Sequence, residues 1–331
     1  MKQRVVIVGA GVVGCLSALA LALRGWQVTL VERGVVGGEA SWAGGGILFP
    51  LLPWHYRPQV NQLAFAGAAE YPALCRELLA HTGIDPEYQA CGMLLPGCAG
   101  QNELAWCRQH GISAELRADG LWLPQVAQVR NPRLVQALHA RLRQLGVDIH
   151  ERTELLPLSC ADRLLNTWHS ACGKAFAADV YVITAGAWSR SLLGASAMPV
   201  QIKPMRGQML LYRLPPGTLP CILYRDDFYL IPRRDGHILA GSTVEDVGFD
   251  KSTTPEAAAE LAAKACALLP QLAQAPLLRH WSGLRPGSPD NLPTIARHAQ
   301  FDNLYLNAGH FRYGVTMAPA SARILCDLLG S

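Results

Sequence analysis

Charged residues are scarce in this chain of 331 residues. They make up 16% of it, against a usual share of ~25%, while half of the residues are apolar. A chain this rich in apolar residues can bury a core, which excludes an intrinsically disordered protein. Lys and Arg exceed Asp and Glu by only 29 to 25, so we expect no nucleic-acid partner. The length fits about two domains.

Paired cysteines are also missing. The ten cysteines are scattered, and no two of them form a CxxC pair. This spacing excludes the disulfide framework of a short secreted domain and the close ligand pairs of a typical zinc site. We therefore expect no metal, reduced thiols and a cytoplasmic location.

One long uncharged run is present near the N-terminus. Residues 5–23 read VVIVGAGVVGCLSALALAL and follow a basic start, MKQR. Hydropathy alone would suggest a signal peptide or a membrane span. Three glycines interrupt the run, however, and an acid, Glu32, ends the next apolar segment. These interruptions favour a strand, a turn and a helix over a membrane span.

The run contains a GxGxxG motif in the expected context. Residues 5–8 form a β-branched strand, residues 15–24 a helix, and residues 27–31 a second strand that ends at Glu32. In such a unit the glycines allow a tight turn, approach of a pyrophosphate to the backbone, and close packing of helix on strand. The helix N-terminus faces the anion, and the acid accepts the ribose hydroxyls. The pattern predicts dinucleotide binding by Gly9, Gly11, Gly14 and Glu32.

The segment after the second strand indicates which dinucleotide is bound. Residues 37–47 form a long loop rich in glycine, where an NAD-binding half-domain would normally enter its next helix. Small residues can run beside a long cofactor such as FAD, with Ser41 near a phosphate. A flexible surface loop is the alternative interpretation, and an NAD dehydrogenase is the alternative class.

The rest of the chain alternates helices and strands, then changes character. We expect helices over 61–81, 102–108, 132–145, 256–269 and about 317–329, and buried strands over 147–150, 155–158, 178–184 and 304–307. Asn131 is the expected N-cap of the third helix. Residues 208–212, 228–232 and 237–241 predict an antiparallel sheet with a hairpin turn at 233–236. Arg206, Arg233 and Arg234 are expected to be solvated turn charges.

These elements predict an α/β fold with two domains. The first is a discontinuous Rossmann domain of the glutathione-reductase-like, FAD-binding type, made of residues 1–82, 132–199 and 279–331. The second is an inserted, antiparallel β-rich substrate domain made of residues 83–131 and 200–278. Ligands of such sheets bind at the carboxyl ends of the strands, which places Ala185 and Gly186 at the cofactor.

Eight segments carry a resemblance to a known family. They read VVIVGAGVVG (5–14), GGEASWAGGGIL (37–48), VRNPRL (129–134), VITAGAWS (182–189), MRGQM (205–209), YLIPRRDGHILAGST (229–243), HWSGLRPGSPDNLP (280–293) and NAGHFRYGVTMAPAS (307–321). In these segments, spread over nearly the whole length, the chain resembles the glycine oxidases of the thiamine pathway, in the D-amino acid oxidase superfamily. Tyr313 stands where that family usually has Asn.

The resemblance implies a set of flavin contacts. Those at the pyrophosphate, ribose, adenine and phosphate loop are Val12, Val13, Glu32, Arg33, Ala40, Ser41 and, through its backbone, Leu155. Those beside the isoalloxazine are Gly45, Gly46, Ile47, His310, Phe311, Arg312, Tyr313, Gly314, Val315 and Thr316. Residues 307–317 contain no cysteine, where covalent relatives place one, so we expect non-covalent FAD.

The resemblance also implies substrate residues: Tyr229, Arg285 and Arg312. An arginine offers a planar fork that matches a carboxylate, and such an anchor orients the substrate for hydride transfer. No general base is assigned, and His310 is expected to pack at the flavin edge rather than act as a base. Three structural alternatives stay open, namely pairing of Arg285 with Asp290, pairing of Arg312 with Asp302, and Tyr229 as an ordinary strand aromatic.

The implied activity is oxidative deamination of glycine and other small amino acids or amines, such as sarcosine and small D-amino acids. Hydride transfer to flavin N5 would give the imine, then the 2-oxo acid and ammonia, and dioxygen would be reduced to hydrogen peroxide. The imine could also supply thiazole synthesis. The alternatives are a D-amino acid dehydrogenase that passes electrons to a quinone and a flavoprotein that serves only as a subunit. A homo-oligomer is possible.

Overall fold

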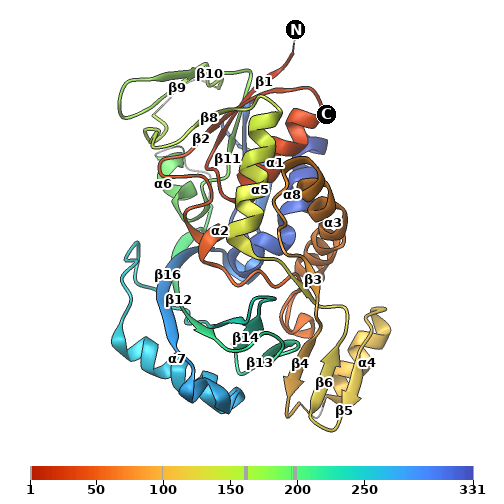
Figure 1. The fold of residues 1–331 in the computed structure, drawn as a ribbon. Coiled ribbons are helices and arrows are strands. Elements are labelled where there is room, and N and C mark those ends of the chain that lie inside the picture. The colour runs from red at the N-terminus through yellow and green to blue at the C-terminus, as the bar shows by residue number, and fades with distance from the viewer. Residues whose placement is uncertain (1, 99, 160–162, 195, 197–199, 331) are drawn as a thin grey trace.

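The structure is a computed structural model that describes residues 2–98, 100–159, 163–194, 196 and 200–330. Cys160, one of the cysteines expected to be reduced, lies outside the described residues. Two sheets dominate the molecule, a mostly parallel one at the end where both termini lie and a second, larger one at the other end (Figure 1).

The first sheet has six strands in the order β17-β18-β11-β1-β2-β8. Their bounds are β1 Arg4–Val8, β2 Gln27–Val31, β8 Asp148–His150, β11 Val180–Ile183, β17 Thr294–Arg297 and β18 Leu304–Ala308. All neighbours are parallel except β17, which pairs with β18 antiparallel. The central strands are apolar on both faces because both faces are covered.

Alternate residues of β1 belong to two different cores. Val5 and Ile7 join the cluster under the helices, whereas Val6 and Val8 join the cluster under a small hairpin. The helical layer gathers on one side of the sheet in Figure 1. It comprises α1 Val12–Leu23, α3 Pro58–Thr82, α5 Asn131–Gln144 and α8 Gly314–Leu328. The hairpin is β9 Thr167–His169 with β10 Ala175–Ala177. The shorter helices are α2 Ala40–Ala43 and α6 Ser189–Leu193.

The second sheet has eight strands in the order β16-β12-β15-β14-β13-β4-β6-β5. Their bounds are β4 Met93–Pro96, β5 Glu115–Arg117, β6 Gly120–Leu123, β12 Lys203–Arg213, β13 Ile222–Arg225, β14 Phe228–Pro232, β15 His237–Gly241 and β16 Leu277–Gly287. The pair β13–β4 is parallel and the other described pairs are antiparallel. Helix α7, Pro255–Leu268, packs on one face of the sheet, and α4 is Gln101–Gln109.

The remaining short elements complete the chain. They are β3 Gln89–Ala90 with β7 Ala127–Gln128, and the 3-10 turns η1 Pro53–His55, η2 Gly186–Trp188, η3 Pro270–Gln274, η4 Pro289–Asn291 and η5 Phe311–Tyr313. Among the described residues, no helix combines the length and the apolar character that a membrane crossing requires.

The expected α/β architecture is confirmed, with corrections to two local predictions. Residues 155–158 form no strand, because Leu155 makes an isolated bridge to Ser170 and its neighbours continue as loop. Asn131 does not cap α5, since it is the first residue inside the helix and follows Arg130. The expected domain boundary at residue 279 falls inside β16, whose pairing with β12 continues to Gly287. We therefore propose that the substrate domain extends to Gly287.

Candidate active site

One cavity lies between the two sheets, at the carboxyl ends of the parallel strands. It brings together every residue expected to bind cofactor or substrate except Gly14. Side chains that were not expected there also line it, among them Phe49, Leu51, Asn131, Trp188 and Leu284. Segments from residue 8 to residue 316 thus meet around a single site.

Two glycines of the GxGxxG turn are required by packing. Gly9 has φ +106°, and a Cβ on it would lie 2.7 Å from the Cα of Ala185. A Cβ on Gly14 would lie 1.9 Å from the carbonyl oxygen of Gly9. Thr184 closes the same corner, because its hydroxyl donates to the Gly9 carbonyl at 2.6 Å. The turn is therefore tight enough to bring the start of α1 to the cavity.

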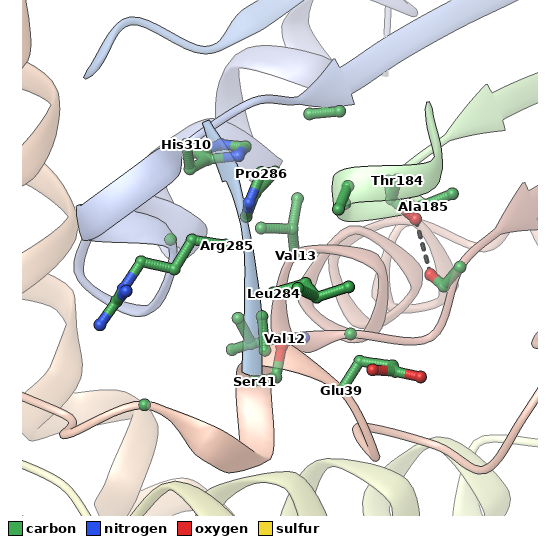
Figure 2. A pocket seen from close by; sticks show the side chains of 18 of the residues that line it. Val12, Val13, Glu39, Ser41, Thr184, Ala185, Leu284, Arg285, Pro286 and His310 are labelled. Atoms are coloured by element: carbon green, nitrogen blue, oxygen red, sulfur yellow. Dashed lines mark hydrogen bonds between the residues drawn. The ribbon is translucent and has the colours of Figure 1, made fainter. Parts of the chain in front are cut away.

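The N-terminus of α1 is suited to an anion. Gly11 precedes the helix and has no side chain to cap it, and the first turn carries no acidic residue. The backbone N–H of Val12 donates to Ser41 Oγ at 2.9 Å. Figure 2 shows Ser41 beside Val12 and Val13. Amides at a helix N-terminus bind phosphate groups, and Ser41 lines the cavity beside this one.

Glu32 is held at the end of β2 by backbone amides. Its two carboxylate oxygens accept the N–H groups of Ala10 and Gly34, each at 2.8 Å. Each oxygen keeps lone pairs that could accept ribose hydroxyls. Next to it the guanidinium of Arg33 lies 3.7 Å from the ring centroid of Trp188. A flat stack of this kind at the cavity wall suits an adenine.

The glycine-rich loop is fixed rather than flexible. The Gly45 carbonyl accepts an Arg233 N–H at 2.8 Å, the Gly46 carbonyl accepts the Val129 N–H at 2.9 Å, and the Ile47 carbonyl accepts the Thr316 hydroxyl at 2.9 Å. Three successive carbonyls are thus held from three segments that are distant in sequence, so the alternative of a flexible surface loop is wrong.

Arg233 was expected to be solvated, and this expectation is wrong. The side chain is 6% exposed and also donates to Gln128 and to the Val129 carbonyl. Burial lowers the pKa of Arg233 to about 10, so it keeps its charge at neutral pH. Arg234 is half-exposed and pairs with Asp85 at 2.9 Å, as a surface turn charge does.

At the opposite end of the cavity, Arg285 and Tyr229 meet through a serine. Arg285 Nη2 donates to Ser242 Oγ at 2.7 Å, and Nη1 donates to the Thr243 carbonyl at 3.1 Å. The Tyr229 hydroxyl donates to the same Ser242 oxygen at 3.1 Å. Burial lowers the pKa of the Arg285 guanidinium, although nearby Tyr229 and Glu245 oppose the shift.

Arg285 does not pair with Asp290, which was the structural alternative to binding a substrate carboxylate. Asp290 pairs instead with Arg57 at 3.0 Å. Within the part of the chain that the structure describes, the acceptors bonded to Arg285 are both neutral oxygens. Figure 2 shows the side chains of Leu284 and Arg285 leaving β16 in opposite directions. This partly buried cation thus has N–H groups left for an anion beyond the two bonds to Ser242 and Thr243.

The neighbouring strand β12 makes room for this guanidinium. A Cβ on Gly207 would lie 1.9 Å from Arg285 Nη1, so no larger residue fits beneath it. Arg206, next to Gly207, is 4% exposed and pairs with Glu245 and Asp250, which corrects the expectation of a solvated turn charge. Its backbone N–H and carbonyl also bond Glu245, which fixes the segment that follows Ser242 and Thr243.

The turn before α8 contributes Arg312, His310 and Tyr313. Arg312 Nη1 lies 3.6 Å from Asp227 Oδ1, whereas Asp302 pairs with Arg163, so the proposed Asp302 alternative is wrong. His310 is buried, and burial lowers its pKa to about 3, so the ring is neutral and a poor base. Tyr313 is buried and donates to the Leu51 carbonyl at 3.3 Å.

Helix α8 begins at Gly314, immediately after this turn. Gly314, Val315 and Thr316 line the cavity, and the first turn carries no acidic side chain. The positive end of the helix dipole therefore faces the cavity and favours negative charge there.

Sequence reasoning missed two polar side chains of the site. Ser242 stood inside a segment that was singled out, but its contacts with Tyr229 and Arg285 depend on the pairing of strands. Asn131 was assigned to a helix cap, yet it is fully buried, lines the cavity, and its amide nitrogen and oxygen find no partner among the described residues.

The comparisons with known proteins agree with this geometry. A model of the FAD dependent oxidoreductase family matches residues 4–328, and the chain belongs to that family. It is 45% identical to a glycine oxidase of Pseudomonas aeruginosa, over 99% of this chain and 95% of that protein. It is 32% identical to the bifunctional protein ThiO/ThiG of Trichormus variabilis, over 99% of this chain but 53% of that protein.

Solved structures give the same result. The glycine oxidase of Bacillus cereus superposes with a TM-score of 0.90 at 27% identity, covering 99% of this chain and 95% of that one. That of Geobacillus kaustophilus superposes with a TM-score of 0.91 at 26% identity, with the same coverage. The chain is an amine oxidoreductase with FAD as its cofactor.

The cavity fits FAD on the evidence of its own residues. The N-termini of α1 and α8 both face it, and the glycines at its wall exclude side chains. The amide of Asn131, which has no hydrogen-bond partner among the described residues, lines it. The site residues expected from the sequence, apart from Gly14, are therefore gathered at one place, and their individual roles are proposals.

Proposed function

We propose that this protein oxidises glycine and other small amino acids and amines, including sarcosine and small D-amino acids. Glycine, dioxygen and water would give glyoxylate, ammonia and hydrogen peroxide, by way of the imine. The observation that carries the proposal is the partly buried Arg285, which bonds neutral oxygens beside Tyr229 at the wall of the FAD cavity. A guanidinium in that state favours a carboxylate ligand.

Residues at the substrate end of the cavity position the substrate carboxylate. Arg285 binds the substrate carboxylate, and Ser242 and Thr243 hold its guanidinium in one orientation. Tyr229, kept in place by Ser242, offers a neutral hydroxyl beside it. Fixing the carboxylate aligns the neighbouring C–H bond, and this alignment lowers the barrier to hydride transfer.

FAD, when bound, would supply the electron sink for the hydride that the substrate loses. Burial lowers the pKa of His310 to about 3, so His310 would not take a proton from the substrate ammonium. Hydride transfer needs the neutral amine, so we expect the ammonium to lose its proton to water before that step. The N-terminus of α8 stabilises negative charge on the side of the cavity that it faces.

The relatives support this choice of substrate, because glycine oxidases match along nearly the whole chain. The match to ThiO/ThiG supports a further role, the supply of the imine product to thiazole synthesis. Eight of the described cysteines, all but Cys326, form no disulfide with another described residue, which supports the cytoplasm as the compartment.

Glycine and the purified yellow protein test the proposal. Without oxygen, glycine should bleach the flavin, and in air it should release hydrogen peroxide. Bleaching without peroxide, with a dye or quinone reduced instead, would establish the dehydrogenase alternative. A flavin that no small amino acid bleaches would contradict amino-acid oxidation altogether. Acid precipitation should leave FAD in the supernatant, since residues 307–317 hold no cysteine to bind it.

A further inference from the structure

The two arginines at the substrate end differ in their partners. Arg285 bonds neutral oxygens, as described above. Arg312 faces a carboxylate of the protein itself, because its Nη1 lies 3.6 Å from Asp227 Oδ1. Arg312 lines the cavity, whereas Asp227 has a side chain that is 73% exposed and reaches it from the solvent side.

Asp227 is held in that position. It occupies the two-residue turn between β13 and β14, where Asp226 and Asp227 have φ of 52° and 58°. Two left-handed residues are what the tight hairpin turn requires, so the direction of the Asp227 side chain is set by the backbone. The hydroxyl of Tyr224, which is buried, donates to Asp227 Oδ1 at 2.8 Å.

The side-chain charges at the substrate end of the cavity therefore favour the binding of one negatively charged group. Arg285 and Arg312 contribute two positive charges and Asp227 contributes one negative charge, while the buried His310 is neutral. Glu245 lies nearby, but Arg206 pairs with it and also with Asp250, whose side chain is half-exposed and therefore screened by water. One substrate carboxylate balances the remaining charge, and a second one would meet an arginine that already faces Asp227.

We propose that Asp227 determines specificity, by pairing with Arg312 so that the site selects amino acids with one carboxylate over those with two. This inference rests on the proposed function, because it concerns amino acids that are bound by Arg285. A fixed carboxylate rejects acidic ligands by like-charge repulsion and leaves neutral small side chains unaffected.

Asp227→Asn tests the proposal, and Asp226→Asn is its matched control. Both variants remove one negative charge from the same turn, but the Asp226 side chain is 90% exposed and lies 3.8 Å from Arg225, not beside Arg312. Asparagine at 227 keeps the size of the side chain and an acceptor for Tyr224. The first measurement is kcat/KM for D-aspartate relative to D-alanine. The second is the Kd of malonate relative to glycolate, from the flavin spectrum at low salt.

We expect both ratios to shift toward the dicarboxylate by roughly tenfold in Asp227→Asn, and by less than about threefold in Asp226→Asn. Tyr224→Phe, which releases Asp227 but keeps its charge, should give a smaller shift in the same direction. Unchanged ratios in Asp227→Asn, or equal shifts in both asparagine variants, would overturn the proposal.

Failure of the proposed function would look different from failure of this inference. If the wild-type protein oxidises neither glycine nor D-alanine, the activity is wrong, but the malonate and glycolate ratio still tests Asp227. Because each ratio is measured on the flavin-bound fraction, partial loss of folded protein lowers the signal and leaves the ratio unaffected.

Discussion

Burial of His310 makes the stability of the folded protein depend on pH. Its folded-state pKa of about 3 lies below the usual histidine value of ~6.5, because the ring is removed from water. Between these two values the unfolded chain binds a proton that the folded chain does not. The free energy of unfolding is therefore complete above pH 6.5 and falls as the pH is lowered toward 3, by about 1.4 kcal/mol per pH unit.

His310→Gln should remove this dependence. Between pH 7.5 and 5.0 we expect the wild-type protein to lose about 2 kcal/mol more of its free energy of unfolding than the variant does. Denaturant unfolding of the flavin-bound protein at the two pH values measures the difference. Equal losses in both proteins would show that His310 titrates near its usual value.

At the scale of elements, the glycine-rich loop depends on a residue from the far sheet. Arg233, at the end of β14, donates to the Gly45 carbonyl and to Gln128 and Val129 next to α5. One buried side chain thus joins the nucleotide-binding loop to the substrate sheet. Removing it leaves at least two buried carbonyl groups without a donor.

Arg233→Met and Arg234→Met are a matched pair of variants. The first should cost about 2–5 kcal/mol of folding free energy and weaken FAD binding, because buried acceptors lose their donor. The second should cost less than about 1 kcal/mol, since Arg234 pairs with Asp85 at the surface. Thermal unfolding and titration of the apoprotein with FAD measure both effects. Similar behaviour of the two variants would contradict the role of Arg233.

The same pair shows what could be predicted from the sequence. The βα unit could be, because Gly9, Gly14 and Glu32 act on neighbours that are local in sequence, and the structure has the two strands and the helix where they were expected. Arg233 and Arg234 stand in the same hairpin turn and look alike. What separates them is contact with Gly45 and Gln128, about 190 and 105 residues away. Distant packing of this kind leaves no local pattern.

The prediction that Asn131 caps α5 was wrong for the same reason, namely contacts with residues that are distant in sequence. Asn before Pro is a good local signal for a helix cap, but here Gly44 and Gly46 lie against its side chain, which is fully buried. The substrate residues were predicted from the family resemblance. That resemblance did not point to Ser242, although both Tyr229 and Arg285 donate a hydrogen bond to its hydroxyl.

At the scale of the whole molecule, the site needs both sheets. The parallel sheet and the N-termini of α1 and α8 supply the groups suited to the cofactor, and β14 and β16 supply Tyr229 and Arg285. Residues of both sheets line the same cavity. In Figure 1 the parallel sheet lies toward the end with the termini and the larger sheet toward the other end. The central claim is that β16 places a carboxylate-binding arginine at that junction.

The most direct test of this claim is the Kd of glycine, from the rate of flavin bleaching without oxygen, in Arg285→Ala. The control is Arg279→Ala, which removes an arginine from the same strand that lies over Trp42 instead. We predict that Arg285→Ala loses about 2–5 kcal/mol of binding, a Kd raised at least roughly thirtyfold, while Arg279→Ala binds like the wild-type protein. Unchanged glycine binding in Arg285→Ala would contradict the account.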